Sequence, residues 1–321
     1  MKLTITRRKV LAGCVAFLST VKGTRGQTLR VPRVAIVTSG PGDRIRDWIK
    51  DTLKTLGYEE GKNLVIDFRE ANGRYAELPR LLAEVIAFNP DVIVAEATPA
   101  IAAAQKLTTT IPIIMAPSTD PVGLGFVQSF ARPGGNITGI ANMFDDLTAK
   151  MLDVVKLVFP QARKLGILSS ANPSHPPRVA TAIRAAGAVG IVAESFVAPN
   201  PEDLEGAFAN MKAARCDVVY VLADPPRAAL PPLAIKYNLP AVYQVSTYPG
   251  MGALMAYGPD IHDVFIRAAH YVDRILKGGR PAEMPVEQPT KFVMVINLRT
   301  ARTMNLSIPE RVLLMADEVI E

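Results

Sequence analysis

The chain has 321 residues, of which 49% are hydrophobic and 21% are charged, as is typical of a folded globular protein. Its formal net charge is +6, but residues 1–26 hold six of its 36 Lys and Arg residues and no acidic residue. The remainder is therefore electrically balanced, which argues against a basic nucleic-acid-binding surface. Beyond residue 26 the only cysteine is Cys216, so that part cannot form an internal disulfide.

Residues 1–26 have the pattern of an export signal. A basic start through Lys9 precedes an apolar run over residues 10–21, and small and polar residues follow up to Gly26. The run has about twelve residues, which is too few for a membrane span of roughly 20 and enough for the apolar core of a signal peptide. We therefore predict export to the periplasm, with cleavage of the signal near residue 26.

The type of export signal has alternatives. Residues 6–11, with the pair Arg7 and Arg8, resemble a twin-arginine signal, although paired arginines also occur in ordinary secretory signals. Residues 11–14 spell a lipobox, but the apolar run continues past Cys14, whereas a lipobox cysteine ends the apolar region. The pattern favours export without lipidation and leaves the two export routes open.

From residue 33 onward, short apolar runs alternate with stretches of helical periodicity. The first series predicts strands at 34–37, 64–68, 91–95 and 111–115, and helices at 45–56, at 76–88 and from Thr98. Residues 117–144 show little clear periodicity. Such alternation is typical of βαβ units, which form a parallel sheet with helices on both faces.

A second series follows a predicted helix at 151–159. It predicts strands at 164–168, 191–197, 217–222 and 241–243, and helices at 178–188, 201–214 and 227–237. The tail adds a helix at 261–276, a strand at 291–298 and a short helix at 299–304. The sequence therefore predicts an α/β protein with two Rossmann-like lobes.

Polar residues that follow predicted strands are the candidate ligand contacts. In open parallel sheets, ligands bind at the carboxyl ends of the strands, where helix N-termini offer N–H groups suited to a carboxylate. The first lobe supplies Thr38, Ser39, Gly40, Thr98, Ser118 and Asp120. The second lobe supplies Ser169, Ser170, Asn172, Asp224, Tyr243, Gln244 and Ser246. Tyr257 could stack on an apolar ligand or pack inside the fold.

These candidates have structural alternatives. Ser39 and Thr98 could serve only as helix caps, each contributing about 1 kcal/mol. Asp120 and Asp224 both precede proline, as turn residues do, although either carboxylate could bind a cation. Trp48 shares the apolar face of a predicted helix, so core packing is favoured for it.

The motifs of catalysis and cofactor binding are absent from the sequence. Its three histidines, His175, His262 and His270, are scattered, which does not suggest a metal site. There is no G-x-S-x-G elbow, no P-loop and no full G-x-G-x-x-G fingerprint. We expect no metal, no cofactor and no catalytic residue.

Several blocks resemble one family of bacterial proteins. Residues 285–292, PVEQPTKF, with VINL at 295–298, are similar to the C-terminal signature of ABC transporter substrate-binding proteins related to the tryptophan-binding type. Further similar blocks lie at 56–58, 60–64, 98–100, 120–125, 131–139 and 257–259. The resemblance is collinear from about residue 33 to residue 321.

The resemblance implies a type I periplasmic-binding fold, in which three chain crossings form a hinge and the ligand lies between the lobes. The N-terminal lobe would span residues 27–140, with about 257–280 returning to it. The C-terminal lobe would span 141–256, completed with the hinge by about 285–321. Among the candidate contacts, the signature blocks carry only Thr98 and Asp120. The segment 224–227, DPPR, is richer in proline than the family pattern, so ligand specificity can differ.

The resemblance also implies a function. We expect a monomeric, exported solute-binding component of an ABC importer that captures a small organic carboxylate or an amino acid, with aromatic ligands favoured, and delivers it to a membrane permease. One alternative is a sensory domain that reports a ligand to a membrane partner. Another is a hydrolase that uses Asp120 and Asp224 as cleft carboxylates.

Overall fold

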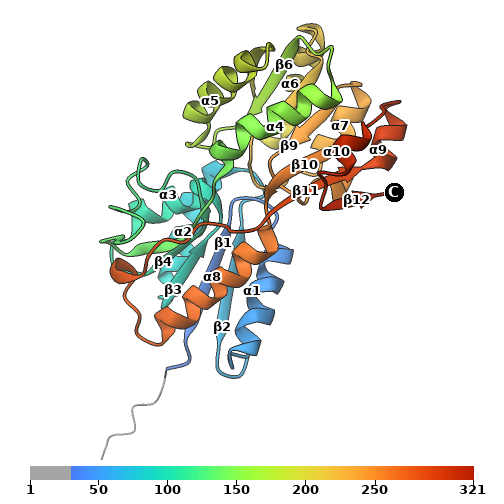
Figure 1. Ribbon diagram of the computed structural model, residues 1–321. Helices are drawn as coiled ribbons and strands as arrows, with labels where there is room; N and C mark the ends of the chain where they lie inside the picture. Colours follow the sequence, from blue (N-terminus) through green and yellow to red (C-terminus); the bar gives the residue numbers. More distant parts are fainter. Residues whose placement is uncertain (1–29) are drawn as a thin grey trace, which may run out of the picture. The chain divides into compact units, whose positions relative to one another are not determined.

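The computed structural model describes residues 30–321 (Figure 1). The predicted export signal, with Cys14 and the paired arginines, lies outside the described residues. The described chain forms two β-sheets, and each sheet carries helices on both faces. None of its helices is both long and apolar enough to cross a membrane.

The first sheet has five parallel strands in the order β2-β1-β3-β4-β5. They are β1 (Arg33–Thr38), β2 (Val65–Glu70), β3 (Val92–Ala95), β4 (Ile113–Ser118) and β5 (Ile137–Ala141). The central strands are short apolar runs because both of their faces are buried.

Four helices cover the first sheet. On one face, α1 (Asp43–Thr55) packs beside α8 (Ile261–Leu276), which returns from late in the sequence and is the orange helix next to the blue one in Figure 1. The other face carries α2 (Leu78–Ala87), which follows the 3-10 turn η1 (Tyr75–Glu77), and α3 (Ala97–Leu107). Alternate residues of β1 contact the two helix layers, with Ile36 on the α1 side and Val37 on the α2 side.

The second sheet has seven strands in the order β12-β11-β10-β9-β8-β6-β7. They are β6 (Lys164–Ser169), β7 (Val192–Val197), β8 (Val218–Val221), β9 (Ala241–Tyr243), β10 (Met255–Pro259), β11 (Phe292–Asn297) and β12 (Glu318–Ile320). The expectation of a wholly parallel sheet needs one correction, because β11 runs antiparallel to β10. The chain leaves this sheet along β10 and comes back along β11, so the two strands point in opposite directions.

The second sheet is also covered on both faces. One face carries α4 (Phe144–Val158), α5 (His175–Ala188), α9 (Leu298–Thr303) and α10 (Glu310–Leu313). The other carries α6 (Leu204–Ala213), which continues the 3-10 turn η2 (Pro201–Asp203), and α7 (Leu230–Lys236). Two further 3-10 turns are η3 (Pro249–Met251) and η4 (Pro281–Glu283).

The chain passes between the two sheets three times, at residues 142–143, at Asp260 and at residues 288–291. The crossings are tied to their neighbours, since Ala141 N–H donates to Glu287 O over 2.8 Å and Lys291 Nζ donates to Asp260 Oδ2 over 2.6 Å. Tyr257, which we expected to begin the return to the first lobe, still belongs to β10 of the second sheet. The return begins at Asp260, the N-cap of α8.

Gly258 lets β10 lie close to the segment after β9. A Cβ at this position would lie 1.8 Å from the carbonyl oxygen of Gln244. We expect Gly258→Ala to lower the free energy of unfolding by about 1–3 kcal/mol, because the backbone of one segment must move. Urea unfolding followed by circular dichroism measures this change.

Gly206 on α6 is the matched control, because a Cβ there meets no atom within 4 Å. Gly206→Ala should raise stability by about 0.5–1 kcal/mol through better helix propensity. Equal effects of the two substitutions would contradict the close approach at Gly258.

Candidate functional site

A cavity of about 550 Å³ lies between residues that follow the strands of both sheets. This volume is in the range of small-molecule sites. The first lobe contributes Trp48, Glu96, Thr98, Thr119 and Phe265 to its wall, among others. Asn142, at the first chain crossing, also lines it. The second lobe contributes Phe144, Asn172, Asp224, Pro225 and Thr247, among others.

The first-lobe wall includes two aromatic residues, Trp48 and Phe265. The ring of Trp48 stacks at 6.2 Å on Phe265 and lies 5.0 Å from the ring of His262. Trp48 projects from α1, whereas Phe265 and His262 come from α8, so the close packing of these two helices creates the aromatic surface. Trp48 packs against the first-lobe core, as the sequence favoured, and its half-buried indole also lines the cavity.

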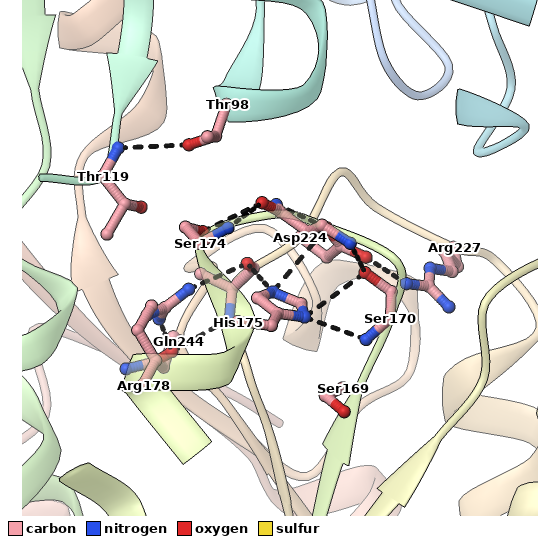
Figure 2. Close-up of polar contacts among 12 residues, drawn as sticks. Thr98, Thr119, Ser169, Ser170, Ser174, His175, Arg178, Asp224, Arg227 and Gln244 are labelled. Carbon is pink, nitrogen blue, oxygen red and sulfur yellow. Dashed lines mark hydrogen bonds and ion pairs between the residues drawn. The ribbon is translucent and has the colours of Figure 1, made fainter. Parts of the chain in front are cut away.

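On the second lobe, Asp224 is the centre of a buried polar network (Figure 2). Asn172 Nδ2 donates to Asp224 Oδ1 over 3.0 Å, and the guanidinium of Arg227 forms an ion pair with Oδ2. Burial alone would raise the pKa of Asp224, but the positive charge of Arg227 and the hydrogen bond from Asn172 hold it below its ordinary value. Asp224 is therefore a charged group whose charge is already compensated within the protein.

His175 supports this network from the first turn of α5. Its Nδ1 accepts the backbone N–H of Ser170 over 2.8 Å, so the ring proton resides on Nε2, 3.1 Å from the carbonyl oxygen of Ala223. Burial lowers the pKa of His175, which keeps the ring neutral. The imidazole thus connects the ends of β6 and β8 and fixes the loops that carry Asn172 and Asp224.

Ser170, His175 and Asp224 superficially resemble a catalytic triad. Ser170 Oγ lies 3.3 Å from His175 Nδ1, and His175 Nε2 lies 3.9 Å from Asp224 Oδ1. However, the Nδ1 lone pair already accepts the amide proton of Ser170, and Ser170 is a buried residue outside the cavity wall. A base whose lone pair is occupied cannot activate a hydroxyl, so this arrangement does not favour a hydrolase.

A second buried cation, Arg178, stabilises the network on the side away from the cavity. Arg178 donates to Asp145 Oδ1 over 3.0 Å and to Ala223 O over 3.2 Å, and it also contacts the side-chain oxygen of Gln244. Gln244 in turn accepts the amide proton of Ala223 over 2.9 Å. These contacts hold the ends of β8 and β9 together behind the cavity.

Glu96 faces the cavity from the end of β3. Its Oε2 accepts the backbone N–H of Ser39 over 2.7 Å, and Ser39 Oγ donates to the Glu96 carbonyl oxygen over 2.8 Å. Burial raises the pKa of Glu96 to about 7, although hydrogen bonds from the amides of Ser39 and Gly40 oppose this rise. The next residue, Ala97, adopts a φ of +64°, a conformation that non-glycine residues rarely adopt and that is often found at functional sites.

The structure brings three of the predicted contacts to the cavity wall, namely Thr98, Asn172 and Asp224. Figure 2 shows Thr98, whose Oγ1 accepts the amide proton of Thr119 over 3.3 Å, apart from the Asp224 network. Ser39 and Ser170 lie behind the wall, where they hold Glu96 and Asn172. Gly40 meets the other lobe, since a Cβ there would lie 2.4 Å from Cβ of Pro225.

Five predicted contacts lie elsewhere. Asp120 is an exposed turn residue with a φ of +43°, and its Oδ1 accepts the amide proton of Gly123 over 2.9 Å. Ser118 is fully buried at the end of β4. Tyr243 is buried in the second-lobe core, where its ring stacks on Tyr248.

The other two of the five belong to β10 and its surroundings. Tyr257 packs in the core of the second lobe, and its hydroxyl contacts Lys150 Nζ at 2.8 Å. Ser246 donates to the carbonyl oxygen of Pro259 over 3.0 Å, next to the second chain crossing. Of the three remaining strand-end candidates, Thr38 donates to the Gly40 carbonyl, Ser169 to the Phe196 carbonyl, and Gln244 to the Phe144 carbonyl.

Several wall residues were missed in the sequence analysis. Glu96 directly follows a predicted strand, so the rule that selected Thr98 would also have selected it. Phe265 could not be found in this way, because it reaches the cavity only through the return of α8. Thr247 Oγ1 is buried in the wall without a hydrogen-bond partner. Within residues 30–321, no three His, Cys, Asp or Glu side chains are grouped so that they could hold a metal ion.

Comparisons with known proteins agree with this architecture. The family model of ABC transporter substrate-binding proteins matches residues 32–320. The tyrosine-binding protein of Clostridioides difficile is 25% identical over 270 residues, covering 82% of this chain and 77% of that protein.

Two solved structures are also similar. An ABC domain from Streptococcus pneumoniae, in complex with L-Trp, has a TM-score of 0.82 and 25% identity, over 90% of this chain and 99% of that one. A conserved domain protein from Vibrio cholerae has a TM-score of 0.84 and 28% identity, over 90% of this chain and 100% of that one. The match of the family model over nearly all described residues, together with the two sheets and the cavity between them, shows that this chain belongs to the ABC transporter substrate-binding protein family.

Proposed function

We propose that this protein is the exported solute-binding component of an ABC importer and that it captures an amino acid or a similar small aromatic compound. The single observation that carries the proposal is the cavity of about 550 Å³, whose wall is supplied by both lobes. Its wall combines aromatic rings with a small number of polar groups, as sites for small organic molecules do.

Aromatic ligands suit this wall. Trp48 offers a half-exposed ring for stacking, and the largely buried rings of Phe265 and Phe144 line the wall as well. The relatives support the same class, since one is named for binding tyrosine and another was solved with L-Trp. A molecule that contacts both lobes stabilises the arrangement in which both reach it, which is how a ligand shifts a hinge between open and closed states.

The same proposal covers the cellular setting. The protein would act as a monomer in the periplasm and deliver its ligand to a membrane permease, while the ATPase activity would belong to the transporter. N-terminal sequencing of the protein recovered from the periplasm should find a start near Gln27. Recovery of an intact N-terminus from the cytoplasm would contradict export.

A thermal-shift screen of the chain without residues 1–26 tests the ligand class. The screen would include aromatic and branched-chain amino acids, aromatic acids and nucleosides. A ligand present at about 100 times its Kd adds about 2.7 kcal/mol to the stability of the folded state. We expect an aromatic amino acid to raise the melting temperature and to be recovered chemically unchanged. Turnover of the bound molecule would contradict a binding role.

A matched pair of substitutions locates the binding site. Ala228 lines the cavity and is exposed, whereas its neighbour Ala229 is exposed but does not line the cavity. We expect Ala228→Trp to weaken ligand binding by at least about tenfold, because the indole occupies space that the ligand needs, whereas Ala229→Trp should bind normally. Isothermal titration calorimetry gives both affinities. Normal binding by Ala228→Trp would place the ligand outside this cavity.

A further inference from the structure

The two buried carboxylates of the cavity wall differ in their partners. Asp224 forms an ion pair with Arg227, so its charge is compensated inside the protein. The ion pairs of residues 30–321 include none to Glu96. Its carboxylate meets only backbone amides of the loop after β1. A buried carboxylate without a cationic partner is costly when it is ionised.

The charged groups around Glu96 leave it without a cationic partner, because the buried cation nearest to this network, Arg227, is already paired with Asp224. Asp224 approaches from the loop after β8, and its charge raises the pKa of Glu96 further. Tyr75 approaches from η1, and its buried hydroxyl lies near Asp224 without meeting hydrogen-bond geometry. Asp43 and Arg44 line the cavity from the first turn of α1, but both are exposed and screened by water. Glu96 therefore lacks the positive charge that would stabilise its ionised form.

A ligand can supply that charge. We propose that Glu96 receives the protonated amine of the ligand, so that the cavity selects organic ammonium compounds with an aromatic or apolar body over simple carboxylic acids. This inference rests on the proposed function and revises its ligand class, since organic carboxylates without an amine are excluded.

The proposal predicts how ligand affinity changes with pH, because the carboxyl of Glu96 must be ionised to bind an ammonium group. The pKa of this carboxyl is raised to about 7 in the described protein. Below that pH the carboxyl is neutral and must lose its proton before it can pair with an ammonium group. Affinity should therefore fall by about tenfold for each pH unit below 7, and it should level off above 7 while the ligand amine stays protonated.

Three related compounds test the ligand class by calorimetry. L-Tyrosine carries both an amine and a carboxylate, tyramine carries only the amine, and 3-(4-hydroxyphenyl)propionate carries only the carboxylate. We expect L-tyrosine and tyramine to bind and the propionate not to bind. Binding of the propionate as tightly as tyramine would overturn the inference and leave the proposed function standing. Failure of all three to bind would overturn the aromatic amino-acid function and this inference with it.

A pair of isosteric substitutions tests the residue itself. Glu96→Gln keeps an oxygen that can accept the Ser39 amide proton but removes the negative charge. We expect it to weaken tyramine binding by about 10- to 100-fold at about pH 8 and to abolish the pH dependence around 7. Glu84→Gln, an exposed site on α2 outside the cavity, is the matched control and should behave as wild type.

Thermal unfolding of both variants separates binding from folding. Neutralising a buried carboxyl should leave the stability of Glu96→Gln equal to wild type or higher. If a folded Glu96→Gln protein binds tyramine with unchanged affinity and an unchanged pH profile, the assignment of Glu96 is wrong. If the loss of affinity is accompanied by a flat pH profile, the ammonium contact is supported.

Discussion

The site depends on two buried carboxylates, Glu96 after β3 of the first sheet and Asp224 after β8 of the second sheet. Asp224 lines the cavity from the second lobe, and its carboxylate is stabilised by Arg227 and Asn172. Glu96 directly follows β3 in the first lobe, where it accepts backbone amide protons and, within residues 30–321, forms no ion pair. A buried carboxylate without a cationic partner, such as Glu96, adds little to the stability of the fold. A protein that must hold a cationic group reversibly gains a site whose missing partner is the ligand itself.

The remaining architecture holds these groups in place. His175 and Arg178 occupy the buried space behind Asp224. His175 accepts the amide proton of Ser170 after β6, both side chains contact the Ala223 carbonyl after β8, and Arg178 contacts the side-chain oxygen of Gln244 after β9. On the first lobe, α8 returns across the hinge to pack beside α1, and this packing brings Phe265 against Trp48. Because each wall belongs to a different lobe, a change in lobe position alters the cavity without altering the local geometry of either wall.

The sequence predicted the two lobes and most of their helices and strands, because apolar runs alternating with amphipathic stretches are a strong signal. It missed β5, β10, β12 and the short helix α10, and of these β5 includes Gly139 in a left-handed conformation. The site was predicted less completely. Thr98, Asn172 and Asp224 were found from strand ends, whereas Trp48 was assigned to the core because one helix face can serve both purposes. The place of Phe265 depends on a contact between α1 and α8, which no local pattern reveals.

Trp48 offers the most direct measurement of the central claim, because it is the only tryptophan of the chain and lines the cavity. The indole emission would be followed during titration with tyramine, excited where tyrosine and tyramine do not absorb. The account predicts a saturable change in emission whose midpoint equals the calorimetric Kd and moves to higher concentration below pH 7. The account would be contradicted if calorimetry detected binding while the emission of Trp48 and its accessibility to a soluble quencher both stayed unchanged. The ligand would then occupy another part of the molecule.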